Sequence, residues 1–269
     1  MLTPDRAEAV AATLDRDRAP RMGEALPPLW HWTYFTPKAP LSALGVDGHP
    51  KLGGFMPPVP LPRRMWVGGR LRFVSPLRAG DRAVRTTEIR DVTAKVGKAG
   101  ALVFVTLRHE VSTESGPAIV EEQDLVYREA RTPGAAATDE PQPPRPDERA
   151  PAEWRDPLVP GPVLLFRYSA VTFNAHRIHY DEAYAREEEG YPGLVMHGPL
   201  TATLLVERLM QRTSGALTEF SFRAVRPLFG NRPMALCGNP VEPGRFDLWA
   251  ETPDGQTAMS AQATISLPA

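Results

Sequence analysis

The chain has 269 residues, of which 42% are hydrophobic, and its formal net charge is −1. This composition predicts a folded globular protein and gives no support for a nucleic-acid or membrane-surface partner. A single cysteine excludes an internal disulfide, and neither a leader-like N-terminus nor an apolar run of the ~20 residues needed to cross a bilayer is present, so we expect a cytoplasmic protein.

The first half of the chain is predicted to begin with a solvated helix at residues 3–18. Residues 26–65 are rich in proline, glycine and aromatic side chains, which is typical of an ordered coil wrapped on a core. The strand patterns that follow cover residues 66–73, 84–96, 101–111 and 119–127. Glycine-containing turns separate the last three, so this half is predicted to end in an antiparallel meander.

A second half with a similar ending follows. Residues 131–160 have the proline, alanine and charge content of an exposed linker. This linker would divide the chain into an N-terminal domain at residues 1–130 and a C-terminal domain at residues 161–269. The strand patterns after it cover residues 220–225, 234–239, 244–251 and 257–266.

Between the linker and the second meander, residues 168–209 contain the densest group of polar residues in the sequence. The pattern predicts a short strand, a polar turn, a short helix capped by Asp181, and a second helix that starts at Gly198 and Pro199. Three of the six histidines lie in this stretch: His176, His179 and His197. We therefore expect the chemistry of the protein to be located here.

A short internal repeat connects the two halves. The pattern R-x-V-x-P-L occurs at residues 72–77 and again at residues 223–228, separated by 151 residues (223 minus 72). Each copy precedes a meander. The repeat therefore predicts a duplication, in which two copies of a helix pack on a curved antiparallel sheet in an α+β fold.

Residues 173–181, FNAHRIHYD, followed by YPGLVMHGPLTATLL, resemble the MaoC-like hydratase family. In that family an Asp-x-Asn-Pro-x-His loop precedes a His-Gly helix start on a hotdog fold. His179 matches the family's catalytic histidine, and His197 with Gly198 matches the helix start. The resemblance covers nearly the whole chain from about Trp30.

The likeness is closer to a double-hotdog branch that contains mesaconyl-C4-CoA (3-methylfumaryl-CoA) hydratase, itaconyl-CoA hydratase and 3-hydroxyacyl-thioester dehydratase. Residues 54–66 and 223–228 belong to this likeness. It implies a double hotdog fold and a hydro-lyase that reversibly hydrates an enoyl-CoA thioester without a cofactor. The implied acyl chain is a short branched dicarboxylic one, such as mesaconyl-C4 or itaconyl.

The chain departs from the wider family at three positions of the loop. Asn174 stands where aspartate is usual, and His176 and Arg177 stand where asparagine and proline are usual. Because an amide takes up no proton, the acid/base work is expected to fall on His179, with Asn174 holding a water or hydroxyl. The backbone N–H of Gly198, at a helix start, is suited to the thioester oxygen.

Four further residues are candidate substrate ligands, each with a plainer alternative. His197 would either line the pocket or orient the turn. Arg177 would meet a substrate or coenzyme phosphate, or pair with the glutamates at 187–189. Arg63 and Arg64 would bind the free carboxylate of a dicarboxylic acyl chain, or contact a CoA phosphate, or form a solvated pair.

Other kinds of site and function remain open in the sequence. The i,i+3 spacing of His176 and His179 is compatible with a metal site. No cysteine or further histidine lies at ligand spacing, so we expect no bound metal. The rival functions are a fatty-acid-type 3-hydroxyacyl-ACP/CoA dehydratase, a hotdog thioesterase and a non-catalytic acyl-thioester binding protein. The expected partner is a CoA-thioester substrate, and a homodimer is a candidate assembly.

Overall fold

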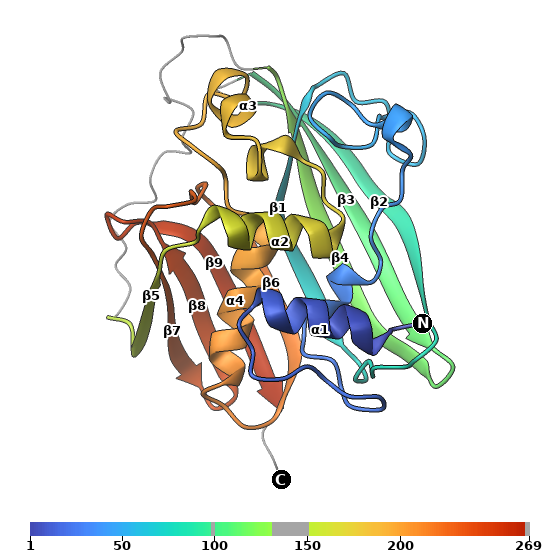
Figure 1. The fold of residues 1–269 in the computed structure, drawn as a ribbon, viewed down its shortest axis with the longest axis vertical. Coiled ribbons are helices and arrows are strands. Elements are labelled where there is room, and N and C mark those ends of the chain that lie inside the picture. Colours follow the sequence, from blue (N-terminus) through green and yellow to red (C-terminus); the bar gives the residue numbers. More distant parts are fainter. Residues whose placement is uncertain (98–99, 131–150, 267–269) are drawn as a thin grey trace.

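The computed structural model describes residues 1–97, 100–130 and 151–266. In this part of the chain the strands form one antiparallel sheet of nine, in the order β2-β3-β4-β1-β6-β9-β8-β7-β5 (Figure 1). The strands are β1 (Arg63–Phe73), β2 (Ala83–Gly97), β3 (Gly100–Thr113), β4 (Gly116–Arg128), β5 (Trp154–Leu158), β6 (Ala216–Ala224), β7 (Met234–Glu242), β8 (Arg245–Glu251) and β9 (Thr257–Ser266). The first half of the chain thus supplies one side of the sheet and the second half the other, joined between β1 and β6.

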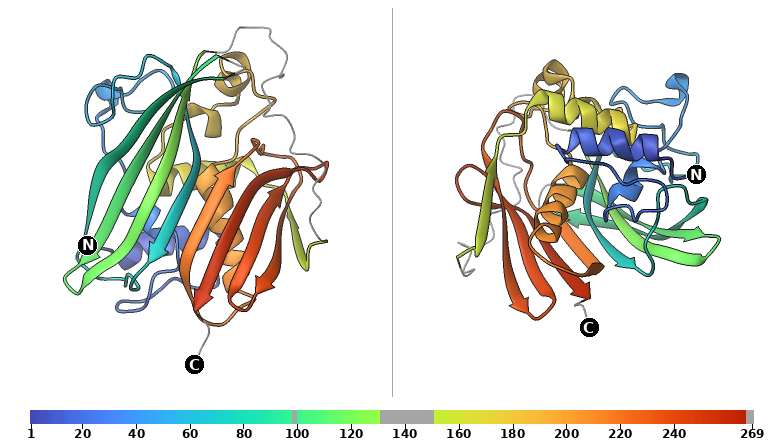
Figure 2. Two further views of the ribbon diagram at one scale, coloured as in Figure 1. Left: turned by 180° about the vertical axis from the view of Figure 1, so that it is seen from behind. Right: turned by 60° about the horizontal axis from the view of Figure 1, so that its bottom comes forward.

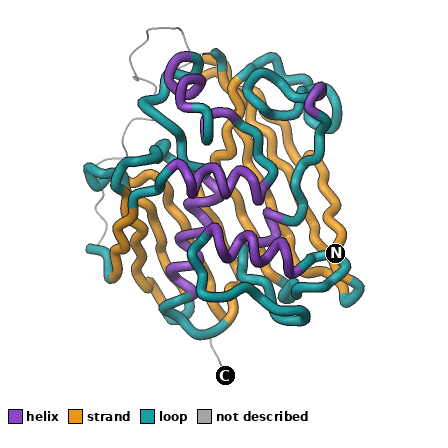
Figure 3. Tube along the Cα trace, viewed as in Figure 1, coloured by secondary structure: helices purple, strands orange, loops and turns teal. Residues whose placement is uncertain are grey.

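The helices lie on one side of this sheet. They are α1 (Pro4–Thr13), α2 (Pro162–Thr172), α3 (Glu182–Glu187) and α4 (Gly198–Met210), with short 3-10 turns η1 (Trp30–Thr33), η2 (Leu41–Ala43) and η3 (Arg177–His179). Figure 3 shows the helices in front of the strands, and the view from behind in Figure 2 shows the opposite side of the sheet. The α+β prediction is confirmed. None of the helices in the described ranges combines the length and apolar character that a bilayer crossing requires.

The two copies of R-x-V-x-P-L occupy equivalent positions in the sheet. Strands β1 and β6 are antiparallel neighbours, and Arg70 lies opposite Ser221. These two residues are 151 apart (221 minus 70), the same offset that separates Arg72 from Arg223. A local two-fold axis through the Arg70–Ser221 pair therefore places Arg72 on Arg223, as a duplication requires.

The backbone hydrogen bonds outside the strands repeat with the same symmetry. After each copy, two successive N–H groups donate to one alanine carbonyl: Val74 and Ser75 to Ala118, and Val225 and Arg226 to Ala258. The segment before each sheet is tied in the same way, with Leu26 donating to Leu77 and Met196 donating to Leu228. Gly80 donates to Leu2 as Asn231 does to Pro160, which makes α1 the counterpart of α2.

The same correspondence locates where the halves differ. In the second half, the segment that follows Met196 becomes the buried helix α4, on which Leu200, Leu205 and Leu209 are fully buried. In the first half, the segment that follows Leu26 forms only the turn η1, and residues 34–62 then leave the core before β1 begins. The second half has an extra segment of its own, residues 173–193, between α2 and α4.

Two predicted elements differ in the structure. The strand predicted near residue 168 is the end of helix α2, because Pro162 at its first turn starts a helix that packs on α1. The predicted linker is wrong at residues 154–158, which form β5 and pair with β7. Pro157 is tolerated there because β5 is an edge strand of the sheet. Residues 131–150 of the linker lie outside the described residues.

Candidate active site

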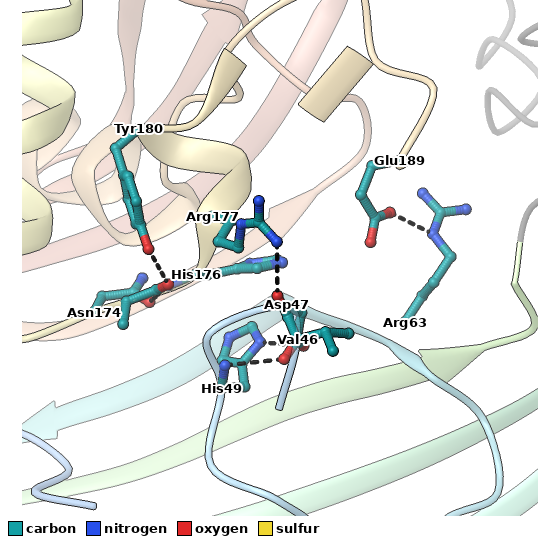
Figure 4. A network of polar contacts seen from close by, with 10 residues as sticks. Val46, Asp47, His49, Arg63, Asn174, His176, Arg177, Tyr180 and Glu189 are labelled. Atoms are coloured by element: carbon teal, nitrogen blue, oxygen red, sulfur yellow. Dashed lines mark hydrogen bonds and ion pairs between the residues drawn. The ribbon is translucent and has the colours of Figure 1, made fainter. Parts of the chain in front are cut away.

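The candidate site lies where the two extra segments meet. The backbone N–H of Arg177 donates to the carbonyl of Asp47 at 2.9 Å, and its guanidinium reaches the carbonyl of Val46 at 3.2 Å. Gly48 lies so close to Ala175 that a Cβ atom added there would overlap the Ala175 carbonyl oxygen. Figure 4 shows this junction between the first-half and second-half segments. Each half therefore supplies one wall.

The second-half segment is shaped by local hydrogen bonds. Phe173 adopts a left-handed conformation, with φ of 51°, and ends α2. The Oδ1 atom of Asn174 then accepts from the backbone N–H of His176 at 3.1 Å, a turn that asparagine favours. Further on, Asp181 caps α3 by accepting from the N–H of Tyr184 at 3.0 Å, which confirms the predicted cap.

These turns position His179, whose Nδ1 atom is hydrogen bonded and whose Nε2 atom is left for the cavity. Its Nδ1–H donates to the carbonyl of Val195 at 2.7 Å, which leaves Nε2 unprotonated. Burial lowers the pKa of His179 to about 4, although the bond to Val195 opposes the shift. The side chain is 7% exposed and lines the cavity. His179 is thus a neutral base at physiological pH.

His197 supports this imidazole from behind. Its ring stacks on that of His179 at 3.6 Å between centroids, and its Nε2 lies 2.9 Å from the hydroxyl of Ser169. It is 1% exposed and is absent from the described residues that line the cavity. Gly198, by contrast, lines the cavity as the first residue of α4. N–H groups of a first helical turn have no partner within the helix, and no hydrogen bond from the Gly198 N–H is found among the described residues.

The first-half segment brings a second polar pair to the same cavity, and no motif in the sequence predicts it. The Nδ1 atom of His49 lies 2.9 Å from Oδ2 of Asp47. The His49 ring is 4.1 Å from the His176 ring, which is in turn 5.3 Å from the His179 ring. Asp47 and His49 lie two residues apart in a glycine-containing loop, a spacing that has no motif value by itself.

Asp47, His49 and His176 also offer one ligand atom each within 4.8 Å of one another, the kind of grouping that holds a metal ion. Two features favour an acid/base pair instead. The imidazole of His49 is already hydrogen bonded to Asp47. The positive charge of Arg64 acts on all three side chains and would repel a cation.

Of the three candidate arginines, two are engaged in ion pairs. Arg63 donates from Nε to Glu189 at 2.8 Å and from Nη2 to Tyr191 at 3.1 Å, which joins β1 to the second-half segment. Arg177 pairs with Asp181 at 2.7 Å, and not with the glutamates at 187–189. Arg64 lines the cavity and forms no ion pair within the described residues.

A cavity of about 2350 Å³ connects these groups. It extends from the histidines across β1, β3 and β4 of the first half, where Trp32, His109 and Glu121 lie on its wall. The volume exceeds that of most small-ligand pockets and is sufficient for a long thioester.

Comparison with known proteins decides the family. The family model for hydroxyacyl-thioester dehydratase type 2 matches residues 29–230. The mesaconyl-C(4)-CoA hydratase of Chloroflexus aurantiacus is 51% identical over 97% of this chain and 91% of its own length. The chain belongs to the hydroxyacyl-thioester dehydratase type 2 family.

Other relatives of this dehydratase family agree. The mitochondrial hydroxyacyl-thioester dehydratase type 2 of Schizosaccharomyces pombe is 29% identical, covering 79% of this chain and 77% of its own length. Among solved structures, HtdX from Mycobacterium tuberculosis superposes with a TM-score of 0.71 at 20% identity, over 98% of this chain and 97% of HtdX. Another M. tuberculosis protein, whose fold is described as a double hotdog, superposes with a TM-score of 0.52.

These findings confirm the double hotdog fold and the assignment to the MaoC-like hydratases and dehydratases. The protein is an enzyme of the hydro-lyase class that acts on thioesters, and the thioesterase and binding-protein readings are set aside. The sequence identified the second-half loop through its resemblance. The first-half pair was missed because only the fold brings residue 49 beside residue 176.

Proposed function

We propose that this dehydratase-family enzyme reversibly hydrates a short branched dicarboxylic enoyl-CoA, with mesaconyl-C4-CoA as the leading candidate. The observation that carries the proposal is His179, whose Nδ1 is fixed on Val195 and whose other nitrogen is left as a base beside the cavity. The 51% identical relative named for mesaconyl-C4-CoA supports the acyl group. Itaconyl-CoA stays an alternative, and cytoplasmic location and a homodimer stay predictions.

The chemistry begins with water. His179 takes a proton from the water through Nε2 as the water oxygen bonds to the β-carbon. The Asn174 oxygen accepts the His176 N–H in its turn and keeps a second lone pair, so both this oxygen and the amide N–H groups can hold that water. The electron pair of the double bond moves toward the thioester, where the N–H of Gly198 stabilises charge on the oxygen. The α-carbon then takes up a proton.

Selection of a dicarboxylic acyl chain is assigned to Arg64. A carboxylate that enters the cavity needs a cation, and a guanidinium binds it with paired hydrogen bonds. Arg63 is less suited to this task because Glu189 already neutralises its charge and its Nε and Nη2 atoms donate to Glu189 and Tyr191. Arg64, on the same strand, lines the cavity without an ion pair among the described residues. Arg63 is accordingly assigned a structural role.

The two arginines form a matched pair for the test. Arg64→Gln should lower kcat/KM for mesaconyl-C4-CoA at least tenfold relative to crotonyl-CoA, because a charged hydrogen bond is worth about 1.5–3 kcal/mol. Arg63→Gln should instead lower thermal stability and affect both substrates alike. The measurement is loss of the enoyl-thioester absorbance, with free thiol assayed in parallel. An equal loss on both substrates for Arg64→Gln would reject the carboxylate role, and thiol release would reject hydration.

A further inference from the structure

Asp47 and His49 are arranged like the carboxylate and imidazole of an acid/base pair. An imidazole whose Nδ1–H donates to a carboxylate keeps Nε2 available, and the carboxylate stabilises the imidazolium when Nε2 takes a proton. The 2.9 Å contact between His49 and Asp47 has this form. Both residues line the same cavity as His179. The pair is held against the catalytic loop by the bond from the Arg177 N–H to the Asp47 carbonyl.

The other members of the histidine cluster lack this construction. His179 donates to a neutral carbonyl and His197 lies beside a hydroxyl, so neither faces a carboxylate. His176 contacts the rings of His49 and His179, and no carboxylate bond to it is found in the described part of the chain. A buried imidazolium needs an opposite charge nearby. In this cluster, a hydrogen-bonded carboxylate is found among the described residues only at His49, and the same Asp47 carboxylate lies within 4.8 Å of a His176 nitrogen.

This matters because residues 173–179 of the loop include no carboxylate. Asn174 is an amide, and an amide transfers no proton. The segment that carries Asp47 comes from the other half of the duplicated chain, where η1 replaces a helix and residues 34–62 are free to enter the cavity. The first-half segment thus supplies a carboxylate, Asp47, and an imidazole, His49, on the wall of the cavity opposite the second-half loop.

We propose that Asp47 and His49 are a second acid/base pair of the active site, in which the His49 imidazole gives the α-carbon its proton while His179 activates the water. The inference rests on the proposed hydratase function and names a catalytic residue in the first half. Asp47 is a positioning residue, since it acts through His49. His176, between the two imidazoles, connects them.

The proton balance is complete within the site. In hydration, the water O–H bond breaks and its proton goes to His179, while the oxygen bonds to the β-carbon. The double-bond electron pair moves to the α-carbon, which takes the proton from Nε2 of the His49 imidazolium. His179 ends protonated and His49 neutral, and one proton returns from His179 to His49 across His176 or through solvent. Dehydration runs these steps in reverse.

The charges around His49 indicate when it carries its proton. Burial, followed by the charge of Arg64 on β1, lowers the pKa of His49, while Asp47 on its own loop raises it. His176 and His179 face it from the second-half segment and repel a proton in their charged forms. A substrate carboxylate beside Arg64 would offset that positive charge. The substrate complex is therefore the state in which the Asp47–His49 pair is protonated.

The test separates the two proton transfers. A saturated thioester, succinyl-CoA, exchanges its α-hydrogens in D₂O with no water addition, so this exchange reports the α-carbon base alone. His49→Gln should lower both hydration and exchange by about 100-fold or more, and Asp47→Asn by a smaller factor in both. His179→Ala should abolish hydration and leave exchange within about tenfold of native. His31→Gln, which removes a buried imidazole bonded to Glu121 and outside the cavity lining, is the matched control and should leave both rates unchanged.

Three results would overturn the proposal. The first is exchange that depends on His179 and not on His49, which would mean one group moves both protons. The second is hydration within threefold of native in both His49→Gln and Asp47→Asn, with thermal unfolding unchanged. The third is a stoichiometric metal in the purified enzyme whose chelation removes activity, since Asp47, His49 and His176 would then be its ligands. Absence of hydration in the native enzyme would reject the proposed function instead, and α-hydrogen exchange would still be measurable.

Discussion

At the scale of single residues, the chemistry open to the site depends on which of its polar atoms already form hydrogen bonds within the protein. The Asn174 oxygen is bound to the His176 N–H, and the His179 Nδ1 is bound to Val195. What remains for substrate is therefore the Asn174 amide, with its N–H donors and the second lone pair of its oxygen, and one imidazole lone pair. The sequence anticipated a hydrogen bond from Asn174 to water, and the turn leaves the asparagine able to donate or to accept in that bond.

Substitution of Asn174 tests this division of its atoms. Asn174→Ala removes both the turn acceptor and the donors to water, so kcat should fall by about 100-fold. Asn174→Asp keeps the acceptor that closes the turn, and should retain measurable activity with the loop in place. Steady-state kinetics and thermal unfolding of both variants provide the check. An alanine variant with native kcat would remove Asn174 from the mechanism.

At the scale of elements, two segments that are far apart in sequence must fit closely. Residues 34–62 and 173–193 meet at Gly48, whose φ of 89° and contact with the Ala175 carbonyl leave no room for a side chain. A residue with a Cβ atom there would separate the segments and displace Asp47 from Arg177. Gly53, in the same segment, has a similar φ of 92° with nothing within 4 Å of an added Cβ.

These two glycines allow a controlled substitution. Gly48→Ala and Gly53→Ala both incur the backbone cost of a left-handed alanine, about 1 kcal/mol. Only Gly48→Ala adds the overlap with Ala175. We expect at least a tenfold loss of kcat/KM for Gly48→Ala and less than a threefold loss for Gly53→Ala. Similar kinetics for the two variants would show that the contact between the segments does not matter for turnover.

The elements also show what a sequence can and cannot predict. The strands other than β5 were predictable because apolar alternation and turn residues are local signals, and Gly198 with Pro199 indicated the start of α4 in the same way. Helix α2 was not, since its aromatic and β-branched residues favour a strand until they pack on α1. The position of His49 beside His176 could not be predicted, because it depends on a loop of the first half whose sequence has no recognisable motif or periodicity.

At the scale of the whole molecule, duplication explains how a large cavity coexists with a stable core. The second half keeps its full helix α4 in the core, while the first half replaces the equivalent helix with η1. The cavity is lined by residues of both halves, and the joined β1 and β6 hold the two halves in register. The proposed roles are divided in the same way, with the proposed water-activating base in one half and the proposed carboxylate-binding arginine in the other.

The buried histidines make the stability of this fold depend on pH. Burial lowers the pKa of His49, His109, His176, His179 and His197. An unfolded histidine titrates at about 6.5, so below that pH the unfolded chain binds more protons than the folded one. The stability from these neutral histidines is full above pH ~6.5 and is lost as pH falls, for His179 down to about 4.

The expected outcome is a free energy of unfolding that falls steeply between pH 6.5 and 5, by about 1.4 kcal/mol per pH unit for each such histidine. Urea unfolding at several pH values measures this slope. Carboxyl groups with lowered pKa values, such as Glu121 and Asp47, titrate below this window, whereas burial raises the pKa of Glu207, which opposes the slope of the histidines. His197→Gln should be less stable at pH 7 yet lose less stability at pH 5, because the variant lacks a group that binds a proton in the unfolded chain and not in the folded one. Equal slopes for the native enzyme and His197→Gln would mean that His197 is not held neutral in the folded state.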